Sequence, residues 1–227
     1  QLIDFYKKIM DGGVGMIKIG NSTVSPLSRL HQRGLALYNW EHAQALKPIF
    51  EYAHKKNVLV VVQLQHYGAQ GSSKYTGFPL LSPSGQYCEK MHKKFPCDQV
   101  VTMTNQDIEN VIEEFAHSAY LVQKAGGKAI QIQAANGYLI SSFLSPYTNK
   151  RNDDYGGSPQ KRALILKRII EAIQIKTNFN LSIFVRLGID DCFDNGEGQK
   201  PEYLQELVYD LEQLNVDGIE CSICIGE

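Results

Sequence analysis

Residues 129–158 read AIQIQAANGYLISSFLSPYTNKRNDDYGGS, and this stretch decides how the rest of the chain is interpreted. It opens as a short apolar strand at 129–133 and continues as a polar loop. Gln133, Asn136 and Tyr138 leave the strand end together, so that amide and phenol groups gather in one place. Because functional side chains are often carried on loops positioned by a rigid scaffold, we expect a functional site here.

Short apolar runs alternate with helical patterns on both sides of this stretch. Strands are predicted at 14–20, 58–64, 129–133, 181–187 and 216–221, and helices at 1–10, 40–56 and 104–125 and from 158 and 201 onward. The run at 58–64 is β-branched and apolar on both faces, which is typical of a parallel strand covered by helices. The alternation predicts an α/β protein with a parallel sheet.

Two architectures could hold such a sheet. A doubly wound sheet binds nucleotide at a Gly-rich first turn, but no G-x-G-x-x-G follows any predicted strand. A (β/α)8 TIM barrel has eight strands in typically ~250 residues. We therefore expect residues 1–227 to form a single partial barrel domain, with about five strands visible and the first and last two missing. The long connection at about 65–103 is interpreted as an active-site excursion.

Composition excludes several classes of protein. The chain has 227 residues, 43% hydrophobic and 21% charged, with a net charge of -1, as in a soluble globular protein. Its dispersed basic residues predict no nucleic-acid partner, and its longest apolar run is too short to span a membrane. The five cysteines, odd in number and scattered, predict reduced thiols in a cytosolic protein. No cluster has metal-ligand spacing, so no metal is expected.

The predicted strand ends carry further polar candidates. In a barrel the site lies at the carboxyl ends of the strands. Asn21 follows the first visible strand, while Gln63 and Arg186 lie near the ends of two others. An inward Gln or Arg is costly unless it meets a polar ligand. Paired inward carboxylates and a nucleophile elbow are both missing, so hydrolysis by those routes has little support.

Residues 133–158 resemble the signature of the Old Yellow Enzyme family of FMN-dependent ene-reductases. That signature is a strand ending in His-x-x-His or His-x-x-Asn, then Gly-Tyr-Leu, Phe-Leu-Ser-Pro, Asn-x-Arg-x-Asp-x-Tyr-Gly-Gly-Ser and a helical Arg. The matching positions here are 136–139, 143–146, Asn149, Arg151, Asp153, 155–158 and Arg162. Residues 12–17, 24–26 with Arg29, 63–68 and 185–186 also follow the family's order.

The resemblance implies an FMN held across the barrel mouth, with NADH or NADPH as reductant. Gln63 would hydrogen-bond the pyrimidine edge of the flavin, and Arg186 would lie near its N1 and O2 atoms. Asn21 falls where the family contacts the flavin from the second barrel strand. Arg151, Asp153 and the tyrosine that follows them are expected to brace the loop rather than to touch a ligand.

The implied reaction is the reduction of an activated alkene, an α,β-unsaturated carbonyl compound. Hydride would pass from the reduced flavin to the β carbon, and Tyr138 would deliver a proton to the α carbon. Asn136 and Gln133 would hold the substrate carbonyl. The partner is then a small molecule, and a homo-oligomer stays open.

Two departures keep alternatives open. The family's His is Gln133 here, and losing an oxyanion donor can cost ~10²–10³ in rate. The family's Arg after the His-x-Gly turn is Ala69. One alternative is a flavin-dependent NAD(P)H oxidase or dehydrogenase with another acceptor. The other is a truncated barrel that no longer binds flavin and is not catalytic.

Overall fold

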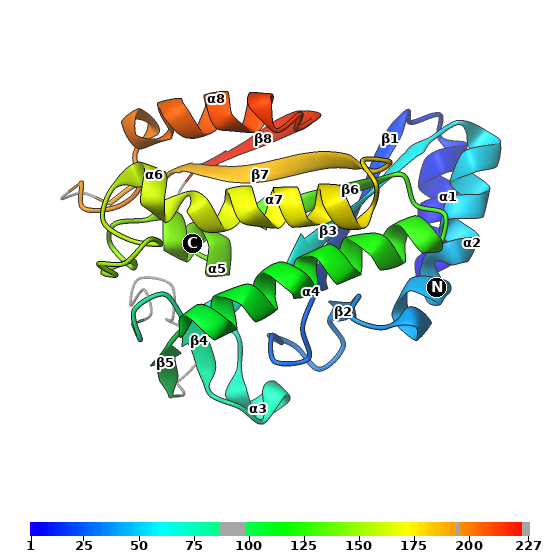
Figure 1. Cartoon of the computed structure of the whole chain (residues 1–227). Helices are drawn as coiled ribbons and strands as arrows, with labels where there is room; N and C mark the ends of the chain where they lie inside the picture. The colour runs from blue at the N-terminus through cyan, green and yellow to red at the C-terminus, as the bar shows by residue number, and fades with distance from the viewer. Residues whose placement is uncertain (87–98, 194–195, 224–227) are drawn as a thin grey trace.

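The computed structural model describes residues 1–86, 99–193 and 196–223. Six parallel strands form the main sheet in the order β2–β1–β3–β6–β7–β8 (Figure 1). They are β1 (Met16–Thr23), β2 (Leu35–Ala36), β3 (Leu59–Gln65), β6 (Ala129–Ala134), β7 (Ser182–Asp190) and β8 (Gly218–Ile223). A separate parallel pair, β4 (Leu80–Ser82) and β5 (Val100–Thr102), lies within the predicted excursion.

Five longer helices alternate with the strands. They are α1 (Leu2–Asp11), α2 (Trp40–Lys56), α4 (Asn105–Lys124), α7 (Leu164–Lys176) and α8 (Gln205–Gln213). The shorter ones are α3 (Ser73–Thr76), α5 (Leu139–Leu144) and α6 (Pro159–Arg162), with the 3-10 turns η1 (Gly68–Gln70) and η2 (Pro201–Leu204). A helix lies between each later pair of successive strands of the main sheet, as is usual for parallel pairing, whereas β1 and β2 are joined without a helix. The predicted α/β class is therefore confirmed.

The structure contains strands and helices that were not predicted, and it divides one predicted helix. All five predicted strands are present, but β2 was expected to be loop. The pair β4–β5 was not predicted either. Helix α5 was also expected to be loop, yet all six of its residues are buried. The helix predicted from residue 158 is interrupted at Ala163, where α6 ends and α7 begins.

The two faces of the sheet differ in chemistry. Side chains alternate between the faces with a period of two. Ile17 and Ile19 are buried against the helices, whereas Lys18 between them is exposed. The same alternation places Ile183 and Val185 of β7 in the apolar core. The inner face instead carries polar side chains, and these lead to the site described below.

The main sheet is curved. Lys18 of β1 donates a hydrogen bond of 2.5 Å to Glu220 of β8, although three strands lie between these two in the sheet. Such a contact needs the inner face to be concave, as it is in a closed or partly closed barrel. The arrangement is that of part of a (β/α)8 barrel.

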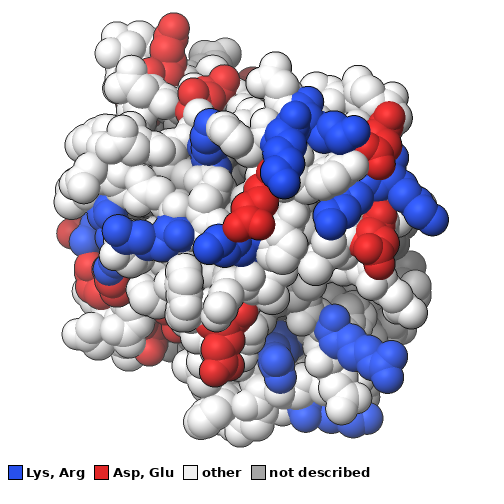
Figure 2. Space-filling model, turned by 90° about the vertical axis from the view of Figure 1, so that its right-hand side faces the viewer, with Lys and Arg blue, Asp and Glu red and all other residues white. Residues whose placement is uncertain are grey.

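The face that lies on the right in Figure 1 carries charged side chains of both signs. Figure 2 shows basic and acidic side chains interspersed over it. Lys56 of α2 pairs with Asp11 of α1 at 2.7 Å, and Lys47 pairs with Glu51 within α2 at 3.9 Å. No helix among the described residues is long and apolar enough to cross a membrane.

The cysteines depart from expectation. Cys192, in the loop after β7, is disulfide-bonded, so the prediction that all five thiols are reduced is wrong for this residue. Spacing along the chain does not reveal which cysteines approach each other in space. Cys221 is a free and exposed thiol. The remaining three, Cys88, Cys97 and Cys224, lie outside the described residues.

Candidate active site

The carboxyl ends of β3, β6, β7 and β8 meet at one edge of the main sheet. Gln133 pairs in register with Arg186, which in turn pairs with Glu220. Gln65 is the last residue of β3. These side chains lie on the inner face, because the apolar residues between them belong to the core. Three of the predicted residues, Gln133, Asn136 and Arg186, are thus brought to one place.

The segment after β6 is held in a tight left-handed turn. Asn136 has φ 60° and Gly137 has φ 66°, and the second value is one that glycine adopts without strain. The Asn136 carbonyl accepts a hydrogen bond from Gln70 Nε2 at 3.0 Å, and its Oδ1 accepts one from Ser222 Oγ at 3.3 Å. Contacts from two other segments therefore fix the position of Asn136.

Tyr138 follows this turn directly and begins helix α5. Its ring meets that of Tyr67 edge to face, with ring centroids 5.4 Å apart. Burial raises the pKa of Tyr138, while the nearby Gln65 amide and the positive charge of Arg186 oppose the rise. Burial likewise raises the pKa of Tyr67 to about 12, and the neighbouring Tyr138 adds to the effect. Both phenols keep their protons near neutral pH, so Tyr138 can act as a proton donor.

Several polar atoms at this edge are buried and have no hydrogen-bond partner among the described residues. They are both amide atoms of Gln65, Nε2 of His66, Oε1 of Gln133 and Nε of Arg186. Buried polar groups are nearly always hydrogen-bonded in folded proteins, and leaving one unpaired costs about 1–3 kcal/mol. Their concentration beside Tyr138 indicates a place for a polar ligand.

Gln63 lies deeper on the inner face than expected for a ligand contact. Its Nε2 donates to Oε1 of Gln131 at 2.8 Å, and Gln131 donates in turn to Glu220 at 2.9 Å. One end of the Gln63 amide is therefore already used within the sheet. Gln65, two residues on and on the same face, has no partner at hydrogen-bond distance among the described residues, and its amide lies near enough to Tyr138 to affect the pKa of that phenol. Gln65 was not predicted from the sequence, although side chains two residues apart on a strand share a face, so that Gln65 lies on the same face as Gln63.

Asn21 lies at the carboxyl end of β1, in an irregular part of that strand. The register of β1 against β3 shifts between Ile19 and Ser22, as in a β-bulge, and Asn21 is half-buried within the shift. Bulges often re-aim a side chain next to an active site. Asn21 is therefore on the expected edge of the sheet, but no contact joins it to Arg186 or Gln133.

The second half of the signature stretch is a structural brace, as predicted. Arg151 pairs with Asp153 at 2.5 Å and donates to the Met103 carbonyl at 2.6 Å. The Tyr155 backbone N–H donates to Asp153 at 3.0 Å. Arg162 is buried and donates to the Leu144 carbonyl at 2.7 Å, which ties α6 to the end of α5. These contacts hold the loop below Tyr138.

His66 belongs to the scaffold of the site. It is fully buried, and burial lowers its pKa to about 3, so the imidazole is neutral. Its Nδ1 accepts a hydrogen bond from the Gly68 N–H at 3.1 Å, and its carbonyl accepts one from the Leu139 N–H at 3.1 Å. His66 thereby joins the end of β3 to the start of α5. Among the described residues no group of His, Cys, Asp and Glu side chains could hold a metal ion.

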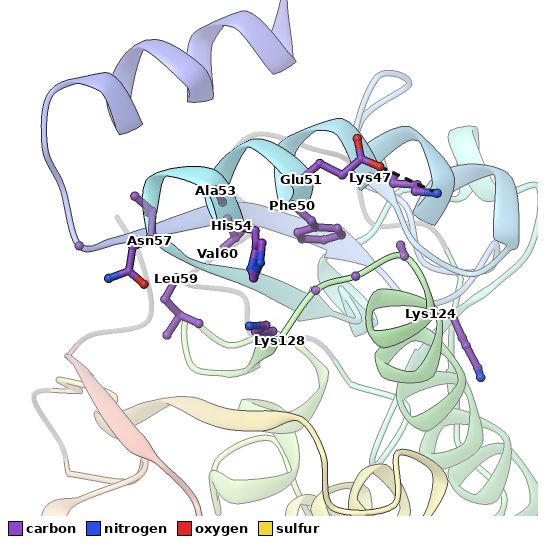
Figure 3. Close-up of a pocket in the computed structure, with 15 residues that line it drawn as sticks. Lys47, Phe50, Glu51, Ala53, His54, Asn57, Leu59, Val60, Lys124 and Lys128 are labelled. Atoms are coloured by element: carbon purple, nitrogen blue, oxygen red, sulfur yellow. Dashed lines mark ion pairs between the residues drawn. The ribbon is translucent and has the colours of Figure 1, made fainter.

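A hollow opens at the opposite, amino-terminal ends of the strands. It lies between the ends of α2 and α4 and has a volume of about 530 Å³. Figure 3 shows the residues that line it. Phe50, His54 and Lys128 are among the residues that line it, and none of the predicted site residues does so. In barrels of this kind the chemistry takes place at the carboxyl ends, so we place the candidate active site there.

The chain is similar in sequence to a known protein family and to two curated enzymes. A family model described as NADH:flavin oxidoreductase / NADH oxidase matches residues 1–223. The chain is 33% identical over 220 residues to an NADPH dehydrogenase of Halalkalibacterium halodurans, an alignment that covers 97% of this chain and 61% of that protein. An NADPH dehydrogenase of Clostridium acetobutylicum is 30% identical over 213 residues, which cover 93% of this chain and 60% of that protein. The chain thus spans about 60% of the length of these curated relatives.

A solved structure is similar over nearly the whole chain. The Old Yellow Enzyme from a Pichia species superposes with a TM-score of 0.84 at 26% identity, covering 98% of this chain and 61% of that one. This likeness bears out the partial-barrel interpretation of the curved sheet.

Proposed function

Because the chain belongs to the NADH:flavin oxidoreductase / NADH oxidase family, we propose that it carries the substrate-facing part of an FMN-dependent oxidoreductase. The enzyme takes hydride from NADPH or NADH and reduces an activated alkene, an α,β-unsaturated carbonyl compound. The observation that carries this proposal is the group of unpartnered polar atoms on Gln65, Gln133 and Arg186 beside a half-buried, protonated Tyr138.

These residues fit an FMN ring. Arg186 offers a buried Nε–H that has no acceptor, and Gln65 offers a donor and an acceptor. The edge of an isoalloxazine ring carries carbonyl oxygens, ring nitrogens and an N–H, which match this set. Asn21 and the free Oε1 end of Gln63 are further candidates for the ring. When bound there, FMN would supply the hydride chemistry, accepting hydride from NAD(P)H and passing it to the substrate.

The protein's own contribution is to bind, orient and protonate. Asn136, fixed by Gln70 and Ser222, and Gln133 would hold the substrate carbonyl with their amides. Donors fixed in place before the reaction stabilise developing negative charge on such an oxygen. Tyr138 would hold the proton that reaches the α carbon.

The test is an anaerobic assay of the purified protein with FMN, NADPH and cyclohexenone. We expect NADPH oxidation that depends on the alkene, with the saturated ketone as product. Purified protein that carries no flavin and takes none up would contradict the proposal and favour a barrel without catalytic function.

The presence of Gln at position 133 favours a second candidate function. It cannot become charged as the family's His can, so the carbonyl clamp differs from that of the ene-reductases. In this second case the enzyme is a flavin-dependent NAD(P)H oxidase or dehydrogenase with another acceptor. The same assay separates the two, because the second candidate oxidises NADPH in air but leaves cyclohexenone unchanged without oxygen.

A further inference from the structure

Among the described residues, two side chains of β8 orient the Arg186 guanidinium. Its Nη2 lies 3.4 Å from Ser222 Oγ, its Nη1 lies 3.6 Å from Glu220 Oε1, and its buried Nε has no partner among the described residues. A guanidinium carries five N–H donors in a fixed plane. Two long contacts orient this plane but leave most of its donors available for a ligand.

Glu220 is itself firmly placed. Its Oε2 accepts hydrogen bonds from Lys18 Nζ at 2.5 Å and from Gln131 Nε2 at 2.9 Å. Desolvation raises the pKa of Glu220, but the hydrogen bonds from Lys18 and Gln131 and the charges of Lys18 and Arg186 outweigh it and lower that pKa overall. Glu220 is therefore a carboxylate at neutral pH. Its second oxygen, Oε1, is the one that faces Arg186.

We propose that Glu220 is a positioning residue, which orients Arg186 toward the flavin ring and partly neutralises its charge. This inference rests on the proposed function, because it assigns a role toward FMN. Ser222, two residues further along the same face of β8, completes the support and also contacts Asn136. Strand β8 would in this way align both Arg186, which faces the flavin ring, and the amide of Asn136, which faces the substrate.

The proposal has two measurable consequences of defined sign. Lys18, Arg186 and Glu220 together carry a net charge of about one positive unit at the inner face, and Glu220→Gln leaves two. The uncompensated Arg186 would then stabilise negative charge on the reduced ring, so the midpoint potential of bound FMN rises. Oxidised FMN, whose ring is neutral, loses only the preorganised Arg186. Its affinity should fall about three- to tenfold, the cost of immobilising one long side chain.

The experiment compares wild type, Glu220→Gln and Glu220→Asp. The dissociation constant of FMN is measured by quenching of flavin fluorescence, and the midpoint potential by spectroelectrochemical titration. We expect weaker FMN binding and a more positive potential in Glu220→Gln, with partial rescue of both in Glu220→Asp. The matched control is Asp210→Asn, which breaks the 2.8 Å ion pair of Asp210 with Lys167 between α8 and α7. This control variant should change the stability of the fold but leave the FMN affinity and the midpoint potential unchanged.

A measurement without FMN tests the pairing itself. A double-mutant cycle of Glu220→Gln and Arg186→Met in urea unfolding should give a coupling free energy distinct from zero. Absence of coupling overturns the inference whatever the flavin result. Normal FMN binding with an unchanged affinity and potential in Glu220→Gln also overturns it and leaves the proposed function standing. Wild-type protein that binds no FMN overturns the proposed function and the assigned role together.

Discussion

Tyr138 is the proposed proton donor to the α carbon of the substrate. We predict that Tyr138→Phe slows alkene reduction by ~10²–10⁴-fold, the usual contribution of a general acid. Reduction of the enzyme by NADPH should be largely kept, because that step needs no proton from the phenol. Stopped-flow kinetics of the two half-reactions provide the measurement. Loss of both half-reactions together would show that Tyr138 is structural, since its ring packs on Tyr67.

Glu114 of α4 gives the fold a predictable pH dependence. Burial raises its pKa to about 7 from 4.5, although Ser25 Oγ donates to its Oε1 at 2.7 Å and opposes the rise. The folded state thus binds this proton more tightly than the unfolded state. The stability from this group is fully present below pH 4.5 and is lost as the pH rises through about 7.

Glu114→Gln should therefore be more stable than wild type above pH 7, by on the order of 2 kcal/mol. The difference should vanish as the pH falls toward 4.5, where the wild-type side chain is neutral in both states. Urea unfolding of both proteins across this range measures it. A difference independent of pH would mean that the carboxyl group is not the cause.

The sequence predicted which polar side chains gather at the strand ends better than it predicted which residues contact them. Gln133, Asn136 and Arg186 lie together, because parallel strands bring their carboxyl ends to one edge. The roles of Gln65 and Glu220 were missed. Both depend on which side chains meet across the concave face, and that follows from sheet curvature, which no local pattern contains.

Among the elements, α4 has a start that the sequence shows clearly. Thr104 Oγ1 accepts a hydrogen bond from the Asp107 N–H at 3.1 Å, and Asp107 Oδ2 accepts one from the Thr104 N–H at 2.8 Å. This reciprocal capping box confirms the prediction of a helix beginning at residue 104. Thr104→Ala should destabilise the fold by about 1 kcal/mol in thermal or urea unfolding. Thr104→Ser keeps the oxygen and should retain most of the stability; equal losses in both variants would contradict the capping role.

Helix α5 and strand β2 show where local patterns fail. Residues 139–144 were expected to belong to the polar loop that continues from the strand at 129–133. In the structure Ser142 Oγ donates to the Gly137 carbonyl at 2.9 Å, and the remaining side chains are buried under the sheet edge. Tertiary burial therefore decides this helix. Strand β2 has only two residues, and its pairing with β1 alone makes it a strand.

For the whole molecule, the α/β alternation and the barrel type could be predicted from the sequence. Buried β-branched runs predict parallel strands, and the connecting helices predict the crossovers. What could not be predicted is the polar line across the inner face, from Gln63 through Gln131 and Glu220 to Lys18. Its members come from four strands, and only the closed curvature brings the first and the last of these strands within reach.

The central claim is that this inner face and the strand ends above it hold FMN. The most direct test is an equilibrium titration of the purified protein with FMN, followed by the visible absorption spectrum and by flavin fluorescence, for wild type and for Arg186→Met. We expect a yellow wild-type protein whose flavin spectrum differs from that of free FMN, and clearly weaker binding in Arg186→Met. A colourless wild-type protein that leaves the FMN spectrum and fluorescence unchanged would contradict this claim.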